Sequence, residues 1–218
     1  MEIGTPIAFF KQTLQSFKTT GAVAPSSPFL AHAMVAQLPP PAKVPPDFRV
    51  LEVGPGTGAF TEALAKRLHG HGRLDLYEIN ADFVRHLRRR LERKKVFIHM
   101  QGRIQLHEGD VLRLPVRPQF DAIVSGLPFN NFTPDEVRSF LEHFRGLLRG
   151  GGTLSYFEYC AIRKLQAPFV SREQRLRLEG IERVVTEFAR TCHARDQIVP
   201  INLPPARVRH LKFGALGS

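Results

Sequence analysis

The stretch "LEVGPGTGA", residues 51–59, decides the fold of this 218-residue chain. An apolar run typical of a buried strand leads into it, and a helical pattern follows it. Glycines 54, 56 and 58 let the backbone turn tightly and approach a ligand closely. The stretch therefore predicts a strand, a ligand-binding turn and a helix in direct succession.

Strands and helices alternate after this turn. Strands are predicted at 48–53, 73–79, 104–110, 120–126 and 153–159, and helices at 57–69, 80–95 and 134–148. After a helix near 168–179, the segments 181–194 and 206–213 resemble two long strands joined through 199–205. This order predicts an α/β domain with a mostly parallel sheet, covered on both faces, and an antiparallel hairpin at one edge.

Capping signals mark several helix ends. Thr133 and Glu136 form a capping box, and Gly150–Gly152 are expected to end the helix that it begins. Ser26 or Ser27 can cap a helix that has Pro28 at its start. The proline-rich segment 39–47 is a connector, so we divide the chain into N-terminal helices at 1–46 and a core at 47–218.

The formal charge of +11 indicates a polyanionic partner, either nucleic acid or an anionic membrane surface. Much of this charge lies in the helix at 80–95, whose apolar side is Val84, Leu87 and Leu91. The two cysteines form no CxxC pair and the histidines are scattered, so we predict no metal site. Without a signal-peptide pattern or a membrane-spanning run, we expect a cytoplasmic location.

A helix that begins after Thr5 carries apolar side chains at helical spacing. It either packs on its own domain or lies in a lipid interface, with its lysines at headgroup level. The residues expected to touch a membrane are Phe9, Phe10, Lys11, Leu14, Phe17 and Lys18.

Acidic residues follow the next two strands. Glu78 ends the second strand, where it can accept hydrogen bonds from both ribose hydroxyls, and Asp110 follows the third strand. The turn at 54–59 also satisfies the dinucleotide pattern G-x-G-x-x-A, so a nicotinamide enzyme is one alternative.

The spacing E-x-G-x-G-x-G with a later G-D resembles the class I S-adenosylmethionine-dependent methyltransferases, which have a Rossmann-like fold. The resemblance implies that Gly54, Gly56 and Gly58 hold the methionine part, Glu78 the ribose and Asp110 the adenine, while Glu52 supports the turn. The neighbouring residues predicted to complete the cofactor site are Pro55, Thr57, Ile79, Val111 and Ser125.

The stretch "VSGLPFNNF", residues 124–132, ends the fourth strand. It resembles the N-L-P-F/Y motif of methyltransferases that act on nitrogen, among them the ribosomal RNA adenine dimethyltransferases. Gly126 stands where those enzymes carry Asn, so a flipped adenine loses an amide partner. This departure disfavours RNA as the acceptor.

Three segments together, "GAVAPSSPFLA" (21–31), "SGLPF" (125–129) and "NLPPARV" (202–208), resemble the bacterial soluble-type phospholipid N-methyltransferases across essentially the whole chain. This resemblance implies methylation of phosphatidylethanolamine towards phosphatidylcholine by S-adenosylmethionine, with S-adenosylhomocysteine as product. It also implies peripheral contact with the inner face of the cell membrane and no stable nucleic-acid partner. The family tends to carry Thr-Tyr where this chain has Glu158-Tyr159, so an ornithine-type aminolipid stays open, and ribosomal RNA is the second alternative.

The acceptor amine must lose a proton before it can attack a methyl group. We expect the proton acceptor among Tyr159, Glu158 and the carbonyls of Ser125, Gly126 and Leu127. Pro128 and Phe129 are expected to wall the acceptor site, where a ring face suits a methylated ammonium. Arg163 and Lys164 are expected to meet a carboxylate or phosphate of the lipid. A third interpretation is a membrane-binding protein without turnover, and the oligomeric state stays open.

Overall fold

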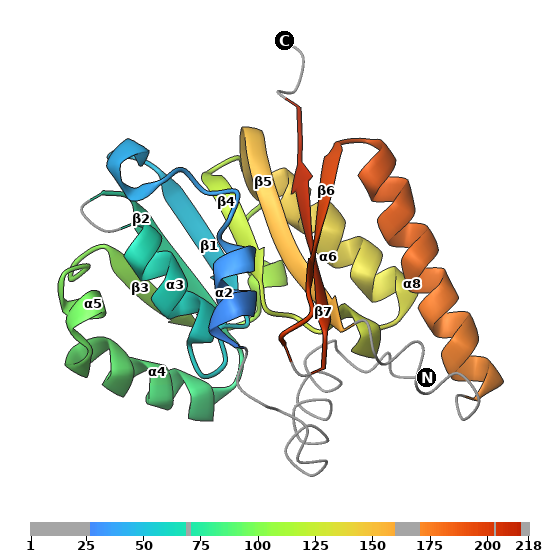
Figure 1. Ribbon diagram of the computed structural model, residues 1–218, viewed down its shortest axis with the longest axis horizontal. Coiled ribbons are helices and arrows are strands. Elements are labelled where there is room, and N and C mark those ends of the chain that lie inside the picture. The colour runs from blue at the N-terminus through green and yellow to red at the C-terminus, as the bar shows by residue number, and fades with distance from the viewer. Residues whose placement is uncertain (1–26, 69–70, 160–170, 203, 215–218) are drawn as a thin grey trace.

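The computed structural model describes residues 27–68, 71–159, 171–202 and 204–214, and it forms one sheet of seven strands in the order β3-β2-β1-β4-β5-β7-β6 (Figure 1). The strands are β1 (Arg49–Val53), β2 (Arg73–Glu78), β3 (Ile104–Glu108), β4 (Phe120–Ser125), β5 (Leu148–Tyr159), β6 (His193–Val199) and β7 (Ala206–Lys212). β1 to β5 pair in parallel, and β7 runs antiparallel to both β5 and β6. The predicted α/β class, the mostly parallel sheet and the antiparallel hairpin are confirmed.

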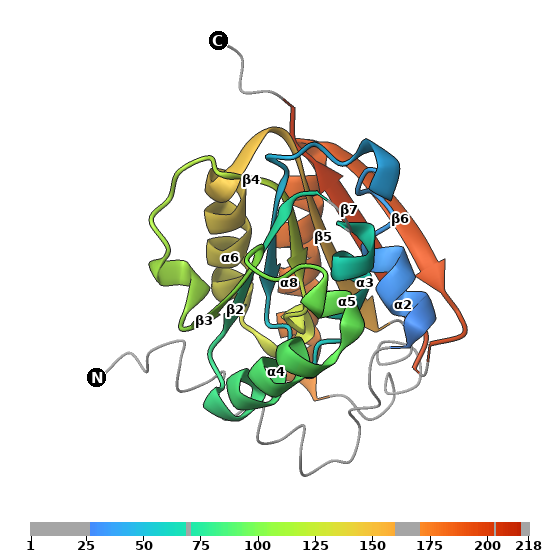
Figure 2. The same ribbon diagram turned by 90° about the vertical axis from the view of Figure 1, so that its left-hand side faces the viewer.

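Helices cover both faces of the sheet (Figure 2). The α-helices are α2 (Pro28–Met34), α3 (Ala59–Arg67), α4 (Ala81–Arg93), α5 (Lys95–Ile98), α6 (Pro134–Leu147) and α8 (Arg172–Arg190), and the 3-10 helices are η1 (Pro41–Lys43), η2 (Val111–Arg113) and η3 (Phe129–Asn131). One hydrophobic core lies between the sheet and α6 and α8, and a second lies on the side of α2 and α3. Burial on both sides explains why the central strands have nearly continuous apolar sequences.

The segment 181–194 was predicted as a strand, and this prediction is wrong. Helix α8 continues to Arg190, and β6 begins only at His193. The buried residues Ile181, Val184, Val185 and Phe188 recur at helical spacing, and α6 packs against this stripe. The β-branched content suggested a strand, but packing of the apolar stripe determined the structure.

The capping predictions are mostly confirmed. Thr133 and Glu136 form the capping box of α6, and the Ser27 hydroxyl accepts a hydrogen bond from the Leu30 amide at 3.2 Å. Gly150–Gly152 do not end α6, which stops at Leu147; they lie inside the first part of β5. Helix α2 is part of the core because Leu30 and Met34 are fully buried, so it packs on the sheet that begins after the connector.

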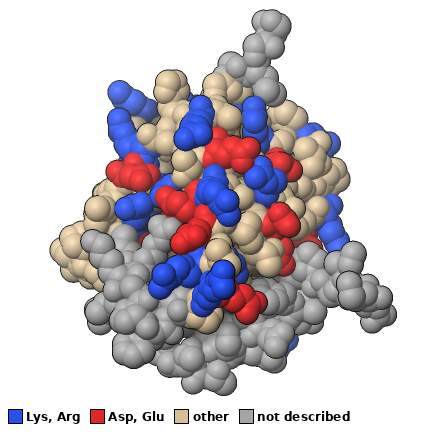
Figure 3. Space-filling view, turned by 90° about the vertical axis from the view of Figure 1, so that its right-hand side faces the viewer, with Lys and Arg blue, Asp and Glu red and all other residues tan. Residues whose placement is uncertain are grey.

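Strand β6 forms an edge of the sheet with mostly exposed side chains. Figure 3 shows that positive and negative side chains are interspersed on the face that it shares with α8. Asp196 of β6 lies 3.9 Å from Arg207 of β7. Charged side chains on an edge strand disfavour pairing with another chain.

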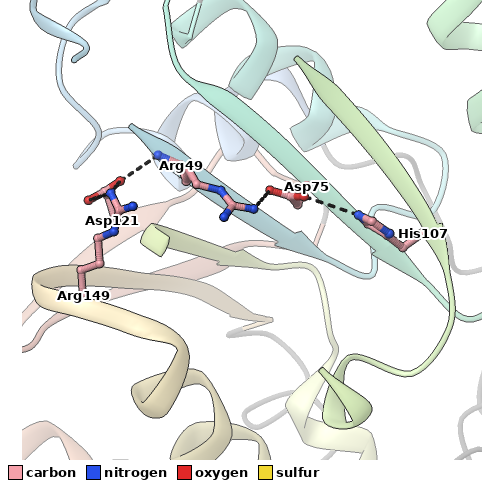
Figure 4. Close-up of polar contacts among 5 residues, drawn as sticks. All are labelled: Arg49, Asp75, His107, Asp121 and Arg149. Carbon is pink, nitrogen blue, oxygen red and sulfur yellow. Dashed lines mark hydrogen bonds and ion pairs between the residues drawn. The ribbon is translucent and has the colours of Figure 1, made fainter. Parts of the chain in front are cut away.

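A chain of polar contacts links residues of β1 to β5 (Figure 4). The Arg49 guanidinium lies 2.9 Å from Asp75, whose other oxygen lies 3.4 Å from His107. The Arg49 amide donates to Asp121 at 2.7 Å, and Arg149 pairs with the same carboxylate at 3.0 Å. Because Asp75 is only 5% exposed, this network holds a buried charge that needs its partners.

We predict that Asp75→Asn lowers the free energy of unfolding by about 2 kcal/mol, since Arg49 loses a charged hydrogen-bond partner. Chemical denaturation compared with Asp47→Asn, at an exposed aspartate, measures the effect. Equal stability of the two variants would contradict the prediction.

Candidate cofactor and acceptor site

The turn after β1 adopts the backbone shape that only glycine takes easily. Gly54, Gly56 and Gly58 have φ values of +66°, +54° and +83°. A Cβ at Gly58 would lie 2.8 Å from the Leu87 side chain, so α3 begins in direct contact with α4. The three glycines thus form a backbone cradle at the carboxyl end of β1.

Glu78 holds this cradle from the neighbouring strand. One carboxylate oxygen accepts from the Gly56 amide at 3.0 Å, and the other accepts from the Asn80 amide at 2.9 Å. Burial raises the pKa of Glu78, and these amides oppose the rise. Each carboxylate oxygen has a second lone pair, so the predicted contact with ribose hydroxyls is compatible with this arrangement.

Glu52, just before the turn, is completely buried, and neither of its carboxylate oxygens has a hydrogen-bond partner in the described part of the chain. Burial raises its pKa to about 8, although the neighbouring Thr61 opposes the rise and Glu78 adds to it. Thr61 lies close enough to influence the charge but makes no hydrogen bond of normal geometry with it. An unpartnered buried carboxylate of this kind favours a cationic ligand nearby.

A mainly apolar pocket opens beside the cradle. Five predicted site residues line it: Gly54, Ile79, Asp110, Val111 and Leu127. The residues that sequence reasoning missed are Val53, Tyr77, Gly109, Phe132 and Phe140. Alternation along β2 points to Tyr77, because it lies two residues before Ile79, whereas Phe140 comes from α6 and gave no local signal.

Several predicted site residues make contacts outside this pocket. Thr57 faces a groove between α2 and α3, and Gly58 is the N-cap of α3. Asp110 lines the pocket and also caps η2, since its carboxylate accepts from the Leu112 amide at 2.9 Å. The cradle and the pocket are therefore adjacent parts of one site, at the carboxyl ends of β1, β2 and β3.

The turn after β4 is in backbone contact with the turn after β1. A Cβ at Gly126 would lie 2.5 Å from the Gly54 carbonyl oxygen, which leaves no room for any side chain. The Gly126 amide donates to the Val53 carbonyl at 2.8 Å, and the buried Ser125 hydroxyl accepts from the Leu127 amide at 3.3 Å. In this structure, the close approach of the two turns thus requires glycine at position 126.

The two aromatic rings of the segment 124–132 have different surroundings. Phe129 is 1% exposed and packs against Tyr156 and Phe140, with ring centroids 5.0 and 6.4 Å away. Phe132 is the ring that borders the pocket. Phe129 therefore has core packing partners in this structure, and its contact with an acceptor amine stays a prediction.

Glu158 and Tyr159 end β5 but point to opposite faces of the sheet. Glu158 lies 3.9 Å from the Arg209 guanidinium, and both side chains are about nine-tenths buried, at 11% and 9% exposed. Tyr159 packs edge-on against Phe157 on the side of α2, and burial raises its pKa. A neutral phenol cannot take up a proton, so Glu158 is the better proton acceptor of the two.

Two of the three segments that resemble phospholipid methyltransferases meet in space. The Ser27 amide donates to the Asn202 side chain at 3.2 Å, and the Asn202 amide group donates to the Pro204 carbonyl at 2.7 Å. These bonds fasten α2 to the turn between β6 and β7. The other predicted residues, Phe9, Phe10, Lys11, Leu14, Phe17, Lys18, Arg163 and Lys164, lie outside the described residues.

The described residues suit S-adenosylmethionine, the expected cofactor. Burial keeps the Glu52 carboxyl mainly protonated at neutral pH, and a nearby cation would favour its ionised form. The cradle at 54–58 admits the amino-acid part of the cofactor. Glu78 supplies acceptors beside the apolar pocket, where a nucleoside base fits. Among the described residues, no group of His, Cys, Asp and Glu could hold a metal ion, and no helix is long and apolar enough to cross a bilayer.

We predict that Gly126→Ala weakens S-adenosylmethionine binding roughly tenfold or more, because an added methyl displaces the Gly54 carbonyl and overpacking costs about 1–3 kcal/mol. Titration calorimetry measures the affinity. Gly214→Ala is the control, since a Cβ there meets nothing within 4 Å. Unchanged affinity in Gly126→Ala would show that the loop contact is unimportant for the cofactor.

We predict that the cofactor-free protein loses stability as the pH rises between 4.5 and about 8, the unfolded and folded pKa values of Glu52. Over this interval the unfolded chain releases the proton that the folded chain retains. Glu52→Gln removes this contribution and flattens the curve. Denaturation at several pH values measures it, with exposed Glu92→Gln as control; identical curves for both variants would contradict the assignment.

Comparisons with known proteins find methyltransferases. Residues 50–152 match the family described as "Methyltransferase domain". The "Ornithine lipid N-methyltransferase" of Singulisphaera acidiphila is 32% identical over 135 residues, which are 62% of this chain and 67% of that protein. The "Ribosomal RNA small subunit methyltransferase A" of a Synechococcus species is 42% identical over 96 residues, 44% of this chain but only 30% of that protein.

Solved structures show the same fold at low sequence identity. The O-methyltransferase of Bacillus cereus, solved in complex with S-adenosylhomocysteine, has a TM-score of 0.63 at 17% identity and covers 94% of this chain and 90% of its own. An O-methyltransferase of Streptomyces achromogenes, solved with S-adenosylmethionine, has a TM-score of 0.61 at 18% identity and covers 94% of this chain and 90% of its own. The chain belongs to the class I S-adenosylmethionine-dependent methyltransferases.

Proposed function

We propose that the protein transfers methyl groups from S-adenosylmethionine to the amine of a membrane aminolipid. Ornithine lipid and phosphatidylethanolamine are the two candidate acceptors. Ornithine lipid ranks first, because the relative from Singulisphaera acidiphila bears that substrate in its name and aligns over two thirds of its length. The wider phospholipid reaction, towards phosphatidylcholine, rests on the three sequence segments alone.

The observation that carries the proposal is the contact between Gly126 and Gly54. With a Cβ excluded at 2.5 Å from the Gly54 carbonyl, position 126 offers the acceptor only main-chain atoms. Carbonyl oxygens suit an aliphatic amine, which has N–H donors and needs no amide partner. An adenine needs donors and acceptors that match its edge, and this position supplies none from a side chain.

The chain's own residues have positioning roles in this reaction. Bound S-adenosylmethionine supplies a methyl group on a sulfonium, and the protein mainly orients the amine and excludes water. The glycine cradle and Glu78 would hold the cofactor, and the carbonyls at 125–127 would aim the amine lone pair. A carbon–nitrogen bond forms as the carbon–sulfur bond breaks.

The amine must reach this geometry in its neutral form. An ordinary aliphatic ammonium has a pKa of about 10, and a neighbouring sulfonium disfavours its proton. Glu158 is the described carboxylate at the end of β5 that could accept the proton and pass it to solvent. Its side chain is 11% exposed, so it retains contact with water.

A second candidate is methylation of adenine in ribosomal RNA. Similarity to several ribosomal RNA small subunit methyltransferases favours it, at 34–42% identity. That similarity covers about a third or less of the length of those relatives. The similarity therefore supports a shared cofactor-binding region more than a shared methyl acceptor.

The test is a transfer assay with S-adenosylmethionine labelled in its methyl group. Separate reactions contain ornithine-lipid vesicles, phosphatidylethanolamine vesicles and ribosomal RNA. We expect label in the organic extract, because main-chain carbonyls would hold the lipid amine. Ornithine lipid should be the better acceptor, in line with the relative from Singulisphaera acidiphila. Label only in RNA would overturn the proposal.

Asp110→Asn provides a control variant that keeps the η2 cap but replaces one acceptor oxygen by a donor. It should weaken cofactor binding and lower transfer to every acceptor by the same factor, roughly tenfold for one lost hydrogen bond. A selective loss for one acceptor would assign Asp110 to the acceptor instead of the cofactor.

A further inference from the structure

Helix α4 and the adjoining α5 present one strongly basic face to solvent. Val84 and Leu87 are buried on the inner side of α4. The exposed cations on the outer side are Arg85, Arg88, Arg89, Arg93 and Lys95, and we call these five residues the α4 basic face. Spacings of three and four residues place most of them on the side opposite the buried pair.

Little negative charge balances this face. Arg85 pairs with Asp82, but no carboxylate in the described part of the chain pairs with Arg88, Arg89, Arg93 or Lys95. The two helices contain one other acidic residue, Glu92. The face therefore keeps a positive excess that must attract anions.

A second group of cations extends this excess towards α3. Lys66, Arg90 and Lys94 all share the single carboxylate of Glu62, at 3.2, 2.9 and 2.6 Å. Lys94 is the main reason that the pKa of Glu62 is lowered to about 2. One carboxylate cannot neutralise three cations, so this border is positive as well.

The α4 basic face lies beside the cofactor cradle. Helix α4 begins three residues after the end of β2, at the carboxyl end of the sheet (Figure 1). Leu87 packs against Gly58, and the Arg90 side chain donates to the Thr57 carbonyl. The surface around α8 and β6, in contrast, has both signs of charge interspersed (Figure 3).

We propose that the α4 basic face docks the protein on an anionic membrane surface, so that the carboxyl end of the sheet faces the lipid. This inference rests on the proposed function, because the amine of an aminolipid stays anchored in the bilayer and the site must come to it. Basic residues near a membrane surface are attracted to anionic lipids. The exposed side chain of Ile98, next to this face in α5, gains more from a lipid interface than from a phosphate backbone.

The experiment compares two charge-reversal variants of the full chain. One is Arg88→Glu/Arg89→Glu/Arg93→Glu. The matched control is Lys43→Glu/Arg73→Glu/Arg117→Glu, whose exposed cations lie near the amino ends of the strands. Both change the net charge equally, and neither alters Arg90 or a residue of the proposed site.

Cosedimentation uses vesicles of phosphatidylcholine with an equal part of phosphatidylglycerol, and vesicles of phosphatidylcholine alone. These vesicles contain no aminolipid, so the measurement is independent of turnover. We expect the α4 variant to bind the anionic vesicles roughly 100-fold more weakly than wild type, and the control variant less than about tenfold more weakly. S-adenosylmethionine affinity should be unchanged in both.

Ribosomal RNA binding by the same variants is measured in parallel by filter binding. Three results would overturn the docking proposal: an equal loss of vesicle binding in the two variants, vesicle binding of the α4 variant as strong as wild type, or a loss confined to ribosomal RNA. The first two would leave the proposed lipid methylation intact, since that reaction is scored by label transfer to lipid. The third would assign the face to RNA.

Discussion

The backbone contact between Gly54 and Gly126 is the constraint on which the rest of the site depends. β1 and β4 are neighbours in the sheet, and their carboxyl ends meet where the Gly126 amide donates to the Val53 carbonyl. A side chain at position 126 would collide with the turn that follows β1. The turn predicted to hold the cofactor and the turn predicted to hold the acceptor are therefore one joined structure.

The two hydrophobic cores hold the turns after β1 and β4 in place. β1 is buried on both faces, and cores on the α6–α8 side and the α2–α3 side press on it. Against this background Glu52 is exceptional, because it is a fully buried acid without a hydrogen-bond partner. Burial raises its pKa to about 8, so the cofactor-free protein becomes less stable as the pH rises towards that value.

Local chemistry made part of the site predictable. Few residues other than glycine tolerate a positive φ, so the position of the cradle could be predicted from residues 51–59. The place of Glu78 beside the cradle could be predicted because it ends a strand. The segment 181–194 failed because its β-branched residues fit a strand, while their helical spacing became decisive only against α6. The surroundings of Phe129 could not be predicted for a related reason: sequence distance does not tell which ring of the segment 124–132 lies in the core and which borders the pocket.

The sequence by itself determined the α/β class, the order of strands and helices, and the glycine turn after β1 that is predicted to hold the cofactor. Short-range preferences decide these features, since they depend on hydrophobic spacing, caps and glycine. Only the tertiary structure decided that position 126 must be glycine, that Glu158 and Tyr159 face opposite sides of the sheet, and that Phe132 and Phe140 line the pocket. These features depend on contacts between segments far apart in the chain, which no local pattern records.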